Sequence, residues 1–113
     1  MARISFVELP VADAAATGRF YEQAFAMKIT AYGPTYACTT MGEGDIGLQA
    51  DPAEKTFAPL PVILVDDLEA VEQAVIEAGG TITRQAFSFP GGRRFQFRDP
   101  AGNELAVAIE VAE

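Results

Sequence analysis

The sequence contains no histidine, one cysteine, and only eight lysine and arginine residues against sixteen aspartate and glutamate residues. Without histidine, Ser-His-Asp and Cys-His catalysis are excluded, as are metal sites built on imidazole ligands. A single cysteine cannot form an internal disulfide bond or a structural zinc site, so we expect a reducing, cytoplasmic setting. The formal net charge of −8, without a basic stripe, argues against nucleic-acid binding.

Long hydrophobic runs are also missing. The longest uninterrupted aliphatic segment, Leu105–Ile109, has five residues and is too short to cross a bilayer, so we expect no membrane insertion. Half of the 113 residues are nevertheless apolar, and this share can bury enough surface to offset chain entropy. The length therefore suits one compact domain.

Two helix-type patterns are present, and each follows an aspartate placed to act as an N-cap. The apolar face after Asp13 consists of Ala16, Phe20, Ala24 and Met27. The apolar face after Asp67 consists of Leu68, Val71, Val75 and Ala78, and Gly79-Gly80 follows where a left-handed residue would end the helix. We expect helices over residues 13–26 and 67–78.

The chain also repeats itself, because residues 6–13 align with residues 60–67 at an offset of 54 without a gap. A strand-like run precedes each helix, at 4–11 and 62–65. Further strand-like segments follow each helix, at 28–32, 36–41 and 45–49 in the first half and at 81–84, 93–98 and 103–109 in the second. This pattern predicts an α+β fold of two βαβββ modules, about 1–52 and about 58–113. Because modules of this size are small for a core of their own, we expect them to pack as a single domain, 1–113.

Four motifs in this order resemble the glyoxalase/bleomycin resistance/extradiol dioxygenase family, the vicinal oxygen chelate superfamily. They are Glu8-Leu9-Pro10-Val11, the segment from Arg19 to Phe25, the segment from Val65 to Ala70, and the turn from Phe97 to Asn103. The resemblance implies two curved sheets that face each other around a cleft. It also implies, for many enzymes of the family, a divalent metal held there by His and Glu side chains from the first and last strands of each module.

Carrying those ligand positions over by the motifs gives Phe6, Leu60 and Ala106, with Leu48 as the fourth. All four side chains are apolar, whereas a dication needs oxygen or imidazole donors. We therefore expect no metal and no cofactor, and the metal-dependent glyoxalase and dioxygenase activities of the family are not supported. An apolar cleft suits a small, partly aromatic organic molecule.

Charged residues near these positions allow two interpretations each, one functional and one structural. Glu8 shares a strand face with Phe6, where it would act as a general base or a clamp for a cation, or would simply be held by a structural hydrogen bond. Arg93 and Phe95 lie on one face of a strand, and an arginine beside an aromatic ring suits a carboxylate or phosphate. The same alternation is also typical of a solvated sheet face.

Three functions follow as hypotheses. The first is a metal-free binding protein, acting in sequestration or resistance, whose ligand is aromatic and neutral or cationic and directs a donor at Glu8. The second is a metal-independent lyase or isomerase that uses Glu8 or a tyrosine as its acid–base group. The third is a dimerising interaction module without a ligand. The family resemblance implies a homodimer in each case, since members commonly cover sheet edges by pairing chains.

Overall fold

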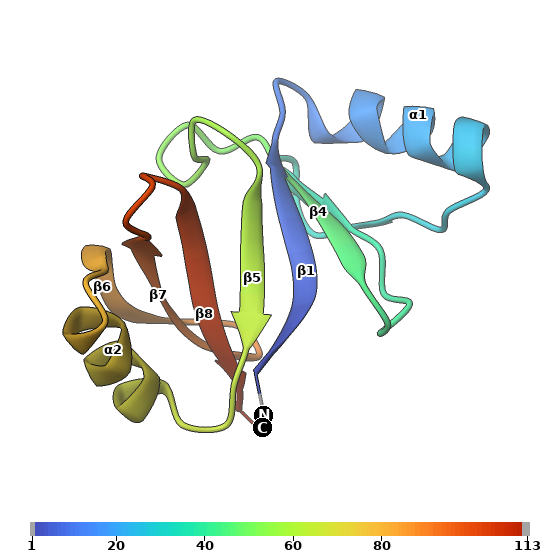
Figure 1. Cartoon of the computed structure of the whole chain (residues 1–113). Coiled ribbons are helices and arrows are strands. Elements are labelled where there is room, and N and C mark those ends of the chain that lie inside the picture. Colours follow the sequence, from blue (N-terminus) through green and yellow to red (C-terminus); the bar gives the residue numbers. More distant parts are fainter. Residues whose placement is uncertain (1, 112–113) are drawn as a thin grey trace. The chain divides into compact units, whose positions relative to one another are not determined.

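The computed structural model describes residues 2–111, which form eight strands and two helices (Figure 1). The first module comprises β1 (Arg3–Pro10), α1 (Ala14–Phe25), β2 (Thr30–Ala31), β3 (Tyr36–Cys38) and β4 (Asp45–Gln49). The second comprises β5 (Leu60–Leu64), α2 (Leu68–Glu77), β6 (Thr81–Phe89), β7 (Gly92–Arg98) and β8 (Glu104–Glu110). The predicted α+β fold with two βαβββ modules is confirmed. Neither helix in this part of the chain is long and apolar enough to cross a membrane.

Two compact units make up the chain, Ser5–Leu60 and Pro61–Glu113 together with Met1–Ile4. In the first unit the strand order is β2-β3-β4-β1, with β1 parallel to β4 and β3 antiparallel to both of its neighbours. The helix α1 covers one face of this sheet. Its core consists of Ala14, Ala37 and Leu48, with half-buried apolar residues packed around them.

The second unit repeats this plan with the order β5-β8-β7-β6. Strand β5 is parallel to β8, and β7 is antiparallel to both β8 and β6. The helix α2 packs against β6, β7 and β8 (Figure 1). Val65, Leu68, Phe95 and Val107 form the core between them.

Both helices begin as the sequence predicts. The Asp13 side chain accepts a hydrogen bond from the backbone N–H of Ala16, and that of Asp67 accepts one from Ala70, each at 3.1 Å. This side-chain acceptor satisfies one of the N–H groups that have no partner within the first helical turn. Gly79, at φ 103°, supplies the left-handed residue expected after α2.

The predicted apolar face of α1 was wrong. Ala14 and Gly18 are its buried residues, whereas Phe20 is 56% exposed. The helix lies close to the chain that follows it, since a Cβ on Gly18 would come within 3.1 Å of Ile29 Cγ2. Small residues permit this close approach, and Phe20 and Phe25 are left exposed, whereas Tyr21 packs against the core.

Strand β6 is longer than the predicted segment, 81–84, and runs to Phe89. Its pairing with β7 shifts register twice, between Ile82 and Arg84 and again between Arg84 and Phe87. Such shifts break the alternation of side chains on which the sequence pattern relies.

Candidate functional site

Each sheet has one face covered by its own helix and one opposite face, here called the helix-free face. In the second module the pairing registers arrange this face in two rows across the four strands. One row is Val62, Ala106, Gln96 and Arg84; the next is Leu64, Ala108, Arg94 and Phe87. One half of the face is therefore aliphatic and the other half is polar and aromatic.

The register shifts in β6 build the polar half. Arg84 and Phe87 are three residues apart, so strict alternation would place them on opposite faces. Arg84 instead pairs with Gln96, and Phe87 pairs with Arg94, which places both on the helix-free face. Bulges of this kind re-aim side chains and are frequent beside functional sites.

A chain of hydrogen bonds crosses this face. Arg94 Nη2 donates to Gln96 Oε1 at 3.3 Å, and Gln96 Nε2 donates to Glu104 Oε2 at 3.1 Å. Glu104 Oε2 also accepts from Thr83 Oγ1 at 2.7 Å. Gln96 is buried, so the amide orientation is fixed by these two partners.

Two guanidinium groups lie against the Phe87 ring. The Cζ atom of Arg84 lies 3.7 Å from the ring centroid, and that of Arg94 lies 5.3 Å away. Arg94 also approaches the partly exposed Phe89 ring, at 6.0 Å. The cation–π attraction orients both groups on one platform.

The helix-free face of the first module carries Glu8, which pairs with Gly47 and is 4% exposed. A Cβ on Gly47 would collide with the Phe6 ring and would lie 2.6 Å from the Tyr36 hydroxyl oxygen. Phe6, Glu8 and Tyr36 are thus brought together, as the shared strand face of Phe6 and Glu8 predicted.

Leu48 does not belong to this face. It packs against α1 with Ala14 and Ala37, so its place among the four ligand positions is corrected. Glu8 corresponds to Val62 in the 54-residue repeat. In the sheets, Val62 pairs with Ala106 on the last strand of its module, and Glu8 pairs with Gly47 on the last strand of its own. The residue equivalent to Ala106 is therefore Gly47, because the first module reaches its last strand with a different loop length.

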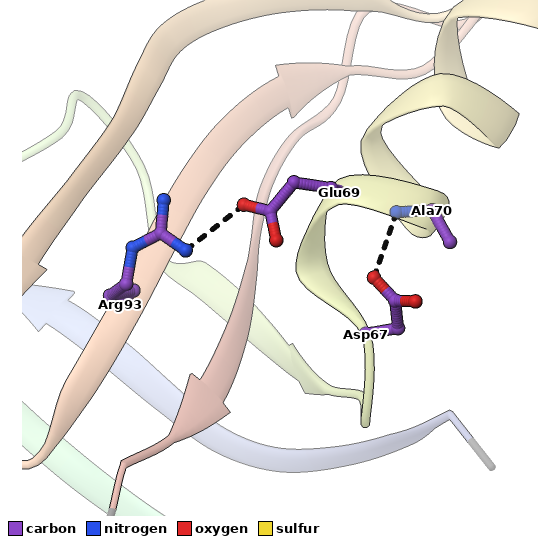
Figure 2. A network of polar contacts seen from close by, with 4 residues as sticks. All are labelled: Asp67, Glu69, Ala70 and Arg93. Atoms are coloured by element: carbon purple, nitrogen blue, oxygen red, sulfur yellow. Dashed lines mark hydrogen bonds and ion pairs between the residues drawn. The ribbon is translucent and has the colours of Figure 1, made fainter.

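Arg93 and Phe95 lie on the helix-covered face, away from Ala106. Phe95 is fully buried in the core beneath α2. Arg93 Nη1 donates to Glu69 Oε2 on α2 at 3.0 Å, next to the Asp67 cap (Figure 2). The assignment of these two residues to the ligand surface is corrected accordingly, and Arg94 and Gln96 occupy the opposite face.

The residues at the family's metal positions do not fit a metal ion. Phe6, Gly47, Leu60 and Ala106 offer no side-chain donor atom, and within residues 2–111 no three His, Cys, Asp or Glu residues are grouped to hold one. Leu60 and Ala106 also have no exposed surface.

Cys38 is not activated for nucleophilic chemistry. Burial raises the pKa of the Cys38 thiol, and the nearby Asp45 carboxylate raises it further. The Asp45 carboxylate has a structural role. Burial alone would raise its pKa, but hydrogen bonds from the Thr39 hydroxyl and from the Gly42 and Met41 N–H groups lower it overall.

The repeated βαβββ module defines a class of α+β protein. The sequence profile of the Glyoxalase/Bleomycin resistance protein/Dioxygenase superfamily matches residues 3–107. The chain belongs to this superfamily, and the resemblance in its motifs is confirmed. No curated protein sequence matches the chain.

Solved structures share this fold. A superfamily member from Vibrio splendidus 12B01 superposes with a TM-score of 0.71 at 18% identity, over 98% of this chain and 100% of the other. The methylmalonyl-CoA epimerase from Mycobacterium tuberculosis gives 0.78 at 15% identity, over 96% and 88%. A hypothetical protein from Bacillus halodurans C-125 gives 0.82 at 14% identity, over 99% and 96%. Identities this low show the fold alone.

Proposed function

We propose that this protein is a metal-free member of the superfamily that binds a small, partly aromatic organic molecule. The observation that carries the proposal is the set of side chains at the four ligand positions, Phe6, Gly47, Leu60 and Ala106, which supply no donor. A superfamily member with these residues recognises its ligand through apolar and hydrogen-bonding contacts rather than by chelation. The protein acts as a homodimer in this proposal.

A second candidate is an interaction module without a ligand. The full burial of Leu60 and Ala106 favours it, because a ligand that reached these side chains would have to displace the groups that cover them. Contacts with a ligand are more accessible at half-buried residues, which include Phe6, Arg84 and Phe87.

A thermal-shift screen of small aromatic compounds tests the proposal. The screen is run on the full chain, once with EDTA and once with added Zn²⁺, Ni²⁺, Mn²⁺ or Mg²⁺. We expect a subset of compounds to raise the Tm equally under both conditions, because a ligand that binds only the folded state stabilises it. Elemental analysis of the purified protein is expected to find no stoichiometric metal.

Two results would contradict the proposal. A bound transition metal whose removal lowers the Tm would show that donors outside the four positions are used. A complete lack of stabilising compounds, together with a dimeric mass from light scattering, would favour the interaction module instead.

A further inference from the structure

We propose that the helix-free face of the second module recognises the anionic end of the ligand, and that the ligand is an aromatic carboxylate. This inference rests on the proposed small-molecule function and specifies its substrate class. The recognition element is the pair of guanidinium groups of Arg84 and Arg94 on the Phe87 ring. Both residues are half-buried, so their charges act in surroundings where water screens them less than in bulk solvent.

The geometry places two guanidinium groups against the same ring. Both Cζ atoms lie within 5.3 Å of the same ring centroid, although the chain as a whole carries a net charge of −8. A guanidinium group presents donors in a planar fork that matches the two oxygens of a carboxylate. The overall negative charge of the chain repels anions at long range. Selectivity for an anionic ligand therefore depends on the two guanidinium groups of Arg84 and Arg94.

The site is built rather than incidental. Two register shifts in one strand bring Arg84 and Phe87 onto the face that holds Arg94. Gln96 accepts a hydrogen bond from Arg94 Nη2 and is itself held by Glu104, which Thr83 holds in turn. Gln96 is therefore a positioning residue that fixes the orientation of the Arg94 fork.

The same place offers a surface for the aromatic body. Phe89 is 38% exposed and its ring centroid lies 6.0 Å from Arg94 Cζ. A flat ring system that stacks on Phe89 would direct a carboxylate substituent toward the guanidinium groups. Offset stacking and the charged fork together favour an aromatic acid over a neutral or cationic aromatic.

The test compares 2-naphthoate with 2-naphthamide, which have the same ring system and differ in charge. Binding of each to the full-length protein is measured by isothermal titration calorimetry. We expect the carboxylate to bind about tenfold tighter or more, since charge-assisted hydrogen bonds are about twice as strong as neutral ones. In Arg84→Gln and Arg94→Gln variants this preference is expected to disappear.

Arg93→Gln is the matched control. Arg93 is on the same strand as Arg94 but on the helix-covered face, where it pairs with Glu69. The substitution removes the same charge from the chain, yet we expect the naphthoate preference to persist. Circular dichroism checks the fold of each variant, and Arg94→Lys, which keeps the charge and loses the planar fork, replaces Arg94→Gln if that variant does not fold.

Each other outcome counts against the inference. Equal binding of the two probes, or a preference that survives both arginine substitutions, overturns it and leaves the proposed small-molecule function intact. Loss of binding in Glu8→Gln but not in the arginine variants would assign recognition to the first module. Failure of both probes to bind also overturns it, and the thermal-shift screen then decides separately whether any small molecule binds.

Discussion

The first module packs its helix on the sheet through alanine and glycine, whereas the second packs its helix through leucine and valine against phenylalanine. Ala14 and Gly18 are the buried residues of α1, and Leu68 is the buried residue of α2. The same order of elements and the same aspartate caps occur in both modules. Local signals thus set where each helix begins, while side-chain volume sets how deep a core lies beneath it.

The two helix-free faces differ as well. Strands β2 and β3 have two and three residues, whereas β6 and β7 have nine and seven. The longer hairpin of the second module has room for the register shifts that collect Arg84 and Phe87 beside Arg94. The first module carries Glu8 beside Phe6 instead. The two modules therefore carry opposite charges on corresponding faces.

The largest expected effect is the loss of a core ring in the second module. Phe95→Ala removes a fully buried side chain that packs beneath α2, and we expect it to lower the free energy of unfolding by about 3–5 kcal/mol. Leu48→Ala in the first module, which also removes a fully buried side chain, should cost less, about 2–3 kcal/mol. Urea denaturation followed by circular dichroism measures both. Equal losses would contradict this order, because Phe95→Ala removes the larger side chain.

The next effect concerns the Asp45 carboxylate, at the start of β4 in the first module. Asp45→Asn removes the charge that accepts three hydrogen bonds, and we expect a loss of about 2 kcal/mol at pH 6. The pKa of Asp45 is lowered in the folded state, so its contribution is complete above the unfolded pKa of about 4 and is lost as the pH falls through the folded pKa. The stability gap between variant and wild type should therefore narrow on acidification below about pH 4.

Asp99→Asn in the second module is the matched comparison. Hydrogen bonds from the Asn103 side chain and backbone lower the pKa of Asp99 with the same sign, but this carboxylate is exposed to solvent. We expect Asp99→Asn to lower the free energy of unfolding by less than Asp45→Asn does. For Asp45→Asn, a difference in the free energy of unfolding from wild type that stays constant between pH 3 and pH 6 would contradict the proposed link between the Asp45 pKa and stability.

The smallest effect should be the same in both modules. Asp13→Ala and Asp67→Ala each remove one N-cap hydrogen bond of 3.1 Å, and each should cost about 1 kcal/mol. The midpoints of urea denaturation, at an unchanged m value, give the comparison. A clearly larger loss for Asp67→Ala would mean that the Arg93–Glu69 ion pair beside it depends on the cap.

The sequence was sufficient to predict the elements that local signals determine. The aspartate caps, Gly79 after α2 and the 54-residue repeat led to both modules, and the motifs led to the superfamily. The face of α1 was not predictable from apolar periodicity, because Phe20 is a larger apolar residue than Gly18 and yet is the exposed one. Only the close contact with Ile29 explains that choice.

The candidate site was predicted only in part, for a related reason. The family resemblance implied Phe6, Leu60 and Ala106, and strand alternation placed Glu8 on the face of Phe6; their part in ligand binding stays a prediction. Leu48 was misplaced because the predicted register of its strand was off by one residue. A shift of one residue moves a side chain to the opposite face of the sheet. Arg84 and Phe87 were not predicted, because the two register shifts in β6 cannot be recognised from the sequence pattern. The closely spaced arginines of β7 did draw attention to this part of the sheet.

Gly47 limits which single substitutions the helix-free face of the first module can accept. The space in which a side chain at this position would project is filled by the Phe6 ring and the Tyr36 hydroxyl group. A side chain introduced at position 47 would therefore require the Phe6 and Tyr36 side chains to shift. A carboxylate at position 47 is therefore coupled to the side chains at positions 6 and 36. Laboratory evolution toward metal chemistry would have to change positions 6, 36 and 47 together.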